Sequence, residues 1–119
     1  MSVIVSSVKL PEALYNQVTS KVIADGYGMR GRSKWIVDAI RALLVLPEFE
    51  QYVEIASDLS NCTHPVSIRM PEDLAMVLEK EVIRIRKIYP EVEAIKSNIV
   101  RASIFQSLIR EIPTRGKNK

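Results

Sequence analysis

The sequence has little of the residues that build disulfide frameworks, barrels and metal centres. Its 119 residues include one cysteine, one histidine and four glycines, and aromatic side chains make up 6% of the chain. A single cysteine excludes a disulfide within the chain and is typical of a reducing compartment. Sparse glycine and few aromatics favour helices over a β-sandwich or a β-barrel.

The sequence also shows no segment that would direct the protein into a membrane. Residues 1–7 have neither the basic start nor the long apolar core of a signal peptide. The longest apolar stretch, residues 39–46, is interrupted by Arg41 and is too short to span a bilayer. An apolar content of 47% is nevertheless enough for a hydrophobic core. We therefore expect a soluble cytoplasmic protein without membrane contacts.

No group of residues predicts catalysis or metal binding. Cys62 and His64 have the spacing of two metal ligands, but the chain holds no further cysteine or histidine to complete a zinc site. The chain has no glycine-rich phosphate loop and no pair of residues that would serve as nucleophile and base. Trp35 is assigned to the core rather than to a platform for stacked bases. We expect no enzymatic activity, no metal and no cofactor.

The most informative feature is an internal repeat. The segment SVKLPEAL at residues 7–14 returns as SIRMPEDL at residues 67–74. Each copy alternates polar and apolar residues up to a proline and then changes to helical spacing, which predicts a strand leading into a helix. Proline suits the helix entrance because its missing N–H is not needed there. The repeat predicts two similar structural units.

The first unit opens with the predicted strand. Val8 and Leu10 point to one face of this strand, and Val5, Ser7 and Lys9 point to the other. Two helices follow, and their apolar stripes predict a buried face on each. These stripes consist of Leu14, Val18 and Val22 in the first helix and of Trp35, Ile36, Ala39, Ile40, Leu43 and Leu44 in the second.

The second unit repeats this order. Its strand places Val66, Ile68 and Met70 inward and Ser67 and Arg69 outward. The apolar stripe of its first helix consists of Leu74, Val77, Leu78, Val82 and Ile85. The offset between the units grows from 60 residues, between positions 7 and 67, to 64 residues, between positions 32 and 96. Four extra residues equal about one helical turn, and we expect them at the corner between the two helices.

Residues 47–63 form an acidic connector between the units. Its acids are Glu48, Glu50, Glu54 and Asp58, and residues 48–63 contain no lysine or arginine. Without these four acids the chain would carry 17 basic and 10 acidic residues, a net charge of +7 rather than +3. This distribution fits a polyanionic partner, and it equally fits solvated faces of mixed charge. We expect a short helix near residues 48–58 that packs loosely on the body.

These elements predict one compact domain over residues 1–119. It comprises unit 1 at residues 3–46, the connector at 47–63, unit 2 at 64–112 and a frayed basic tail at 113–119. A flexible tether between independent domains would be richer in glycine and serine than this connector is. A lone unit can neither pair its strand nor bury its helical stripes, whereas two units can do both if their strands pair antiparallel.

Both units resemble the ribbon-helix-helix, or MetJ/Arc-type, superfamily of DNA-binding proteins. The resemblance lies in the strands ending in Leu10-Pro11 and Met70-Pro71, the amphipathic first helix, and the second helix that opens with Arg32-Ser33-Lys34. It implies a mainly α fold with a two-stranded antiparallel β-ribbon, built as a tandem ribbon-helix-helix that forms an intramolecular pseudo-twofold dimer. The tandem layout, with Leu46-Pro47-Glu48-Phe49 after the first unit, is similar to the TraY-type proteins of conjugative plasmids.

The resemblance implies a sequence-specific double-stranded DNA-binding protein that inserts its β-ribbon into the major groove. Such a protein acts as a transcriptional regulator, for example a repressor, or as an accessory factor of plasmid conjugation in the relaxosome at the transfer origin. Implied partners besides DNA are further copies side by side and a relaxase-type protein. The residues assigned to base contacts are Val5, Ser7, Lys9, Ser67 and Arg69, whereas Pro65 has no donor to offer. The residues assigned to phosphate contacts at the second helices are Gly31, Arg32, Ser33, Lys34, Lys96, Ser97 and Asn98.

Other interpretations of the same residues stay open. The outward strand residues also suit a solvated sheet face, and Ser33 and Ser97 also suit helix caps. Ile95 stands where the first unit has Gly31, so the second helix departs from the residue expected at its cap. The whole chain also suits a helical protein-interaction module that has lost DNA binding. Salt-sensitive binding to duplex DNA would separate that module from a DNA-binding protein.

Overall fold

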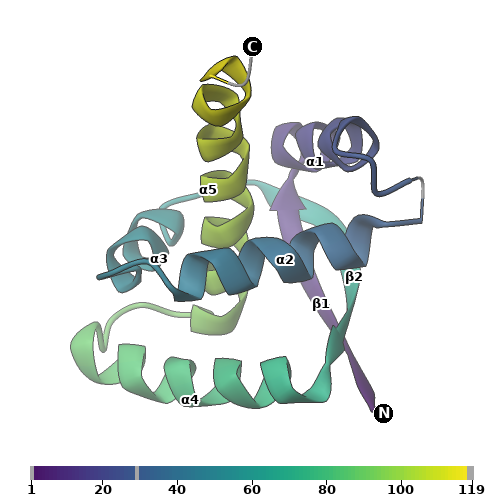
Figure 1. Ribbon diagram of the computed structural model, residues 1–119. Coiled ribbons are helices and arrows are strands. Elements are labelled where there is room, and N and C mark those ends of the chain that lie inside the picture. Colours follow the sequence, from purple (N-terminus) through teal and green to yellow (C-terminus); the bar gives the residue numbers. More distant parts are fainter. Residues whose placement is uncertain (1, 29, 118–119) are drawn as a thin grey trace.

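A computed structural model describes the backbone of residues 2–28 and 30–117 and the side chains up to residue 109, with residue 29 left out. The structure is mainly helical and contains one two-stranded sheet (Figure 1). The elements are β1 (Val3–Pro11), α1 (Glu12–Ala24), α2 (Arg32–Leu44), α3 (Glu50–Ala56), β2 (Cys62–Pro71), α4 (Glu72–Ile88) and α5 (Ile95–Lys117). Among the described residues, no helix is both long and apolar enough to cross a membrane.

The two repeated strands pair with each other as an antiparallel ribbon. Ser7 lies opposite Ser67, and the register runs from Val3 opposite Pro71 to Leu10 opposite His64, with an irregularity at Pro11. The residues that the alternation pattern assigned to the inner face are buried, which confirms this assignment; they are Val8, Leu10, Val66, Ile68 and Met70. The period of two residues along each strand therefore decides which side chains face the core.

Proline ends each strand and sets the start of the helix that follows. Pro11 and Pro71 have φ of −60° with extended ψ, and α1 and α4 begin at the next residue. That residue is a glutamate in both cases, and a carboxylate in the first turn interacts favourably with the helix dipole. The repeated Pro-Glu pair thus fixes the same strand-to-helix corner twice.

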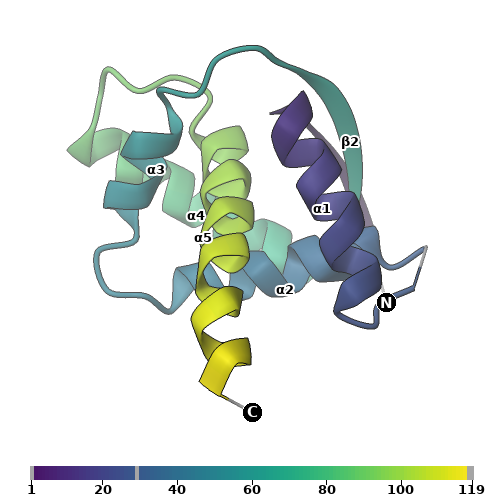
Figure 2. The same cartoon turned by 90° about the horizontal axis from the view of Figure 1, so that it is seen from above.

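The core lies between the ribbon and the helices. Helix α2 packs against β2 and α5, and α5 also contacts β1. Seen from above, α5 runs between α3 on one side and α1 on the other (Figure 2). The largest fully buried side chains are Leu10, Ile36, Ile40, Leu43, Ile68, Met70, Leu74, Leu78, Ile85, Ile95, Ile99 and Ile104. Most of the predicted apolar stripes are therefore confirmed, but Val77 is 42% exposed and its assignment to the buried stripe is wrong.

The connector is part of the core. The helix predicted within it is present as α3, but the expectation that this helix packs loosely is wrong. Phe49, Val53 and Ala56 are all buried, and α3 packs against α5. Arg84 of α4 donates to the carboxylate of Glu50 at 3.2 Å, so the connector is joined to α4 as well as to α5.

The predicted fold class, a tandem ribbon-helix-helix that forms an intramolecular pseudo-twofold dimer, is wrong. The described residues form one two-stranded sheet and five helices, which does not match a tandem of ribbon-helix-helix units with two ribbons. Helix α3 has no counterpart in the second half, and α4 and α5 have 17 and 23 residues against 13 each for α1 and α2. The physical reason is that the connector supplies core side chains, so the interior is not shared by two equivalent units.

Two boundaries also differ from the sequence-based expectation. Helix α4 is four residues longer than α1, 17 against 13, so the extra turn extends this helix rather than the corner that follows it. Helix α5 continues to Lys117, through most of the segment that was expected to be a frayed tail. The last two residues of that predicted tail, 118–119, lie outside the described residues.

Candidate nucleic-acid interface

The outward face of the ribbon carries three cross-strand pairs of side chains. Val5 lies opposite Arg69, Ser7 opposite Ser67, and Lys9 opposite Pro65. All six residues are exposed, and they include every residue that the sequence assigned to base contacts. The structure therefore brings these predicted residues together on one surface, with a basic side chain at each end and hydroxyl groups in the middle.

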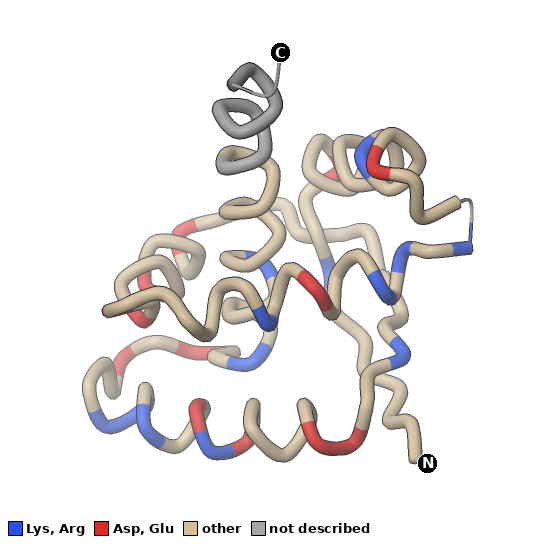
Figure 3. Tube along the Cα trace, viewed as in Figure 1, with Lys and Arg blue, Asp and Glu red and all other residues tan. Residues whose placement is uncertain are grey.

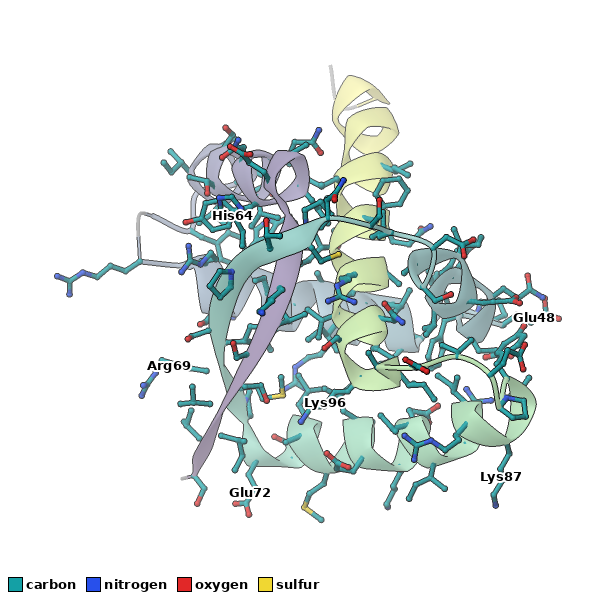
Figure 4. All side chains as sticks on the ribbon, turned by 180° about the vertical axis from the view of Figure 1, so that it is seen from behind. Glu48, His64, Arg69, Glu72, Lys87 and Lys96 are labelled. Carbon is teal, nitrogen blue, oxygen red and sulfur yellow. The ribbon has the colours of Figure 1, made fainter. Side chains whose placement is uncertain are left out.

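This face carries positive charge alone. Neither β1 nor β2 contains an aspartate or a glutamate. Along the ribbon the charged positions are lysine or arginine, whereas the acids lie on the helices and connecting segments (Figure 3). Arg69 extends away from the strand into open space (Figure 4). Within the described part of the chain, neither Lys9 nor Arg69 has an ion-pair partner, so both charges are available to a ligand.

The two outer edges of the ribbon are covered by the second helix of each half. The backbone N–H of Arg69 donates to the hydroxyl oxygen of Ser33 at 3.0 Å. On the other edge, Nε of Arg101 donates to the carbonyl oxygen of Lys9 at 2.8 Å. These bonds occupy backbone groups that point away from the partner strand. Pro65 lies opposite Lys9, at a position where a backbone N–H would point away from β1. The missing N–H of proline therefore costs the ribbon no hydrogen bond between its strands.

Asn98, which is buried, and Arg101, which is half-buried, form a small hydrogen-bond network beside β1. Asn98 is 3% exposed, and its side-chain amide donates to the carbonyl oxygen of Glu93 at 3.0 Å. Its side-chain oxygen accepts a hydrogen bond from Arg101 at 2.9 Å. Asn98 therefore orients Arg101 toward Lys9, and it does not lie on the surface where the predicted phosphate contact would be made.

The N-terminus of α2 keeps its backbone N–H groups free of side-chain caps. Gly31 is the N-cap residue and makes no side-chain hydrogen bond, and Ser33 binds Arg69 instead of capping the helix. A Cβ atom on Gly31 would overlap the carbonyl oxygen of Tyr27, so this position requires glycine. Lys34 is exposed and lies 3.6 Å from Asp38. Uncapped N–H groups beside a lysine are suited to bind an anion.

Arg32 is directed toward α1 rather than away from the protein. Its guanidinium donates to the hydroxyl oxygen of Tyr15 at 3.3 Å and lies 5.7 Å from the centre of that ring. The ring of Tyr15 also contacts His64, with the ring centres 5.0 Å apart. Within the described residues, Nε of Arg32 and Nδ1 of His64 are buried without a hydrogen-bond partner. Arg32 therefore packs at the end of the ribbon and is half-buried.

Two hydrogen bonds fix the loop before α2. The indole N–H of Trp35 donates to Asp25 at 2.8 Å, and the hydroxyl of Tyr27 donates to Asp38 at 2.6 Å. Both bonds join the end of α1 to α2. Ser33, on the same helix, binds β2. The N-terminus of α2 is therefore held on one side by the end of α1 and on the other by the ribbon.

Replacing Tyr27 by phenylalanine should remove a pH-dependent contribution to stability. The hydrogen bond to Asp38, burial and the negative charge of Asp38 raise the pKa of Tyr27 from 10.0 to about 12. Ionisation of this group is harder in the folded state, so its contribution to the free energy of unfolding is complete below pH 10 and is lost as the pH rises toward 12. Urea unfolding of both proteins across this interval should show the steeper loss in the wild type. Parallel curves would contradict the role of this bond.

The N-terminus of α5 differs from that of α2. Ile95 is buried, Ser97 is half-buried, and Lys96 lies 3.5 Å from Glu79 of α4. Figure 4 shows Lys96 directed toward α4. Its charge is thus partly neutralised within the protein. Lys34 has a similar ion pair with Asp38, but its side chain is 74% exposed against 38% for Lys96. The predicted phosphate residues of the two helices are therefore not equivalent, and the α2 end presents its lysine more openly to an anion.

Sequence reasoning missed Arg101, although the repeat contains a signal for it. At the offset of 64 residues, Arg101 corresponds to Val37, which is buried in α2. A charged residue at an apolar position of a repeat indicates a contact that the other copy does not make.

Among the described residues, no group of three or more His, Cys, Asp or Glu side chains is arranged to hold a metal ion.

Comparisons with known proteins do not add to this picture. No family model, no curated protein and no solved structure matches the chain. The geometry of the ribbon and its flanking helices is therefore the basis for any functional assignment.

Proposed function

We propose that this chain binds double-stranded DNA sequence-specifically by placing the outward face of its ribbon in the major groove. The observation that carries this proposal is the acid-free outer face of the ribbon, with Lys9 at one end and Arg69 at the other. The major groove of B-DNA is wide enough for a two-stranded ribbon and presents a distinct pattern of donors and acceptors for each base pair. The inner face of the ribbon packs on the core, so these side chains are held on a rigid support.

Each outward side chain has a chemical role in this proposal. Arg69 can donate two hydrogen bonds to O6 and N7 of guanine, and Lys9 can donate to the same acceptors from a more flexible side chain. The hydroxyls of Ser7 and Ser67 can either donate or accept. Val5 offers apolar contact to the methyl group of thymine. Together they provide hydrogen bonds and apolar contact over a short stretch of sequence.

The helix N-termini would hold the phosphate backbone on either side. The N-terminus of α2 reaches one ribbon edge through Ser33, and α5 reaches the other through Arg101. Uncapped N–H groups at α2 together with Lys34 would bind a phosphate next to the groove. The α5 side would bind less strongly because the side chain of Lys96 is 38% exposed against 74% for that of Lys34. The proposed grip is therefore stronger on the α2 side.

The biological role that we propose is regulation of transcription or assistance in plasmid conjugative transfer at the transfer origin. This part of the proposal is supported by the resemblance of the repeated strand-to-helix segment, SVKLPEAL and SIRMPEDL, and not by the overall fold. Either role requires specific duplex binding. Processing at a transfer origin additionally requires that the bound protein has a direction, and the unequal ends of the ribbon would provide one.

Selection of binding sites from random duplex DNA tests the proposal. We expect a short preferred sequence that is not palindromic, because the two ends of the ribbon present different side chains: Arg69 with Val5 at one end, and Lys9 with Pro65 at the other. A protein with two identical ends would read the same bases on both half-sites. The binding should weaken steeply as the salt concentration rises, because phosphate contacts release counterions.

The control is a double variant, Lys9→Arg with Val5→Pro, which gives both ends the same side chains. Val5 lies opposite Arg69, whose N–H points away from the ribbon, so a proline at position 5 removes no ladder hydrogen bond. We expect the sites selected by this variant to be closer to a palindrome. A palindromic site for the wild type would contradict the proposed direction of binding. Failure to enrich any duplex would contradict DNA binding itself.

A further inference from the structure

An apolar groove lies between α3 and α5. Its volume is about 250 Å³, and it is lined by Tyr52, Ile55, Ala56, Leu59, Ala102, Phe105 and Gln106. Ile55 is 63% exposed and Phe105 is 48% exposed, so large apolar side chains face solvent here. Helix α3 and the ribbon lie at opposite ends of the body in Figures 1 and 2. The groove is therefore separate from the proposed DNA-binding face.

Acidic residues border this groove. A neighbouring hollow of about 640 Å³ shares Ile55 with the groove, and its charged lining residues are Glu54, Asp58, Glu91 and Glu93. No lysine or arginine occurs from Pro47 to His64, so the α3 side has no positive charge of its own. Figure 3 shows the acids gathered over α3 and the segment before α5. An occupant of the groove should combine apolar groups with positive charge.

The exposed side of α4 has this combination. Met76, Lys80, Ile83 and Lys87 follow one another at helical spacing and form what we call the outer stripe of α4. Met76 and Ile83 are 59% and 56% exposed, although both are large apolar residues. The stripe lies opposite the buried side of the helix, which consists of Leu74, Leu78, Val82 and Ile85. Figure 4 shows Lys87 pointing away from the body.

The acids of α4 do not neutralise this stripe. Of the four acids of α4, Asp73 lies 4.0 Å from Arg41, Glu79 lies 3.5 Å from Lys96, and Glu81 accepts a hydrogen bond from Arg84 at 2.8 Å. The fourth, Glu72, is exposed at the first position of the helix, about two turns away from Lys80. Within the described residues, Lys80 and Lys87 have no ion-pair partner. The stripe therefore presents two unneutralised lysines that alternate with two apolar side chains.

We propose that the outer stripe of α4 in one copy of this chain docks in the acid-bordered groove between α3 and α5 of the next copy. Met76 and Ile83 would enter the groove, and Lys80 and Lys87 would face the acids at its border. Two different surfaces meet in such a contact, so it is head-to-tail and leaves one groove and one stripe free for further copies. The product is a row of molecules, or a ring if the rotation between successive copies closes it.

Charge disfavours the two symmetric alternatives. A groove-to-groove contact would bring the acidic borders of two copies together, and a stripe-to-stripe contact would oppose lysines. Only the stripe-to-groove contact pairs opposite charges and apolar groups at the same time. A groove of this size buries little area, so the contact should be weak and should require high protein concentration.

Single substitutions on each surface test the contact by sedimentation, in the absence of DNA. The wild type should show an average mass that rises beyond that of a dimer as the concentration approaches millimolar. Ile83→Glu on the stripe and Ile55→Lys in the groove should each return the protein to monomer mass. Val45→Glu and Val45→Lys are the controls, because Val45 is 80% exposed and lies on neither surface. Circular dichroism should show all variants folded.

A mixture of the two variants decides whether the contact is head-to-tail. The Ile83→Glu protein keeps its groove and the Ile55→Lys protein keeps its stripe, so an equal mixture should form pairs and nothing larger. Pairs formed by one variant alone would show a symmetric contact and overturn the proposal. A wild type that stays monomeric at millimolar concentration would also overturn it. Because no DNA is present, either result leaves the proposed DNA binding untouched.

Discussion

Replacing Lys9 and Arg69 together by alanine is expected to lower the affinity for the preferred DNA site by about 2–6 kcal/mol, or about 1–3 kcal/mol for each side chain. Both side chains extend from the outward face of the ribbon and would lose their hydrogen bonds to base edges. Folding should be unaffected, because the backbone bonds of both residues, to Arg101 and Ser33, do not involve the side chains that are removed. The loss should therefore appear in binding and not in the free energy of unfolding.

Fluorescence anisotropy with the preferred site and with a scrambled duplex measures this loss. Two single variants serve as controls. Lys34→Ala should weaken binding to both duplexes alike and reduce the salt slope by about one, because it removes a phosphate contact. Arg86→Ala, exposed on α4 away from the ribbon, should change neither. If the double variant binds both duplexes as the wild type does, the ribbon is not the DNA-binding face.

Replacing Phe49 by alanine is expected to lower the free energy of unfolding by about 3–5 kcal/mol, the usual cost of truncating a buried phenylalanine. Phe49 is 6% exposed, and the guanidinium of Arg84 lies 5.4 Å from the centre of its ring. Arg84 is itself held by Glu50 and Glu81. The substitution would leave a cavity between α3 and the rest of the core, and it would remove the cation–π contact.

Urea unfolding measures this change. The matched control is Ile55→Ala, which lies on the same helix but is 63% exposed and should alter the free energy of unfolding by no more than about 0.5 kcal/mol. Similar, small effects of both substitutions would mean that the connector packs loosely, as the sequence had predicted. A large effect of Phe49→Ala alone would show that α3 is a structural part of the core.

The sequence by itself determined the local pattern of this protein. Alternation around Val8 and Leu10, and again around Ile68 and Met70, predicted which strand face is buried, and the structure confirms both. The proline at the end of each strand predicted where α1 and α4 begin. These features depend on residues close together in the chain, whose period of two or of 3.6 residues is set by backbone geometry. The six outward residues of the ribbon followed from the same alternation.

The tertiary structure alone decided how these elements share the interior. It placed α3 in the core, although the acidic sequence of the connector predicted a loosely packed helix. Because the second half has no such helix, the two halves are unequal and the predicted fold class is wrong. The tertiary structure also assigned Ser33 and Arg101 to the ribbon edges and buried Asn98, which sequence reasoning had placed against phosphate. A hydroxyl, an amide or a guanidinium can bind backbone as well as phosphate. Which one it binds depends on groups far away in the sequence, and only the folded chain brings those groups within reach.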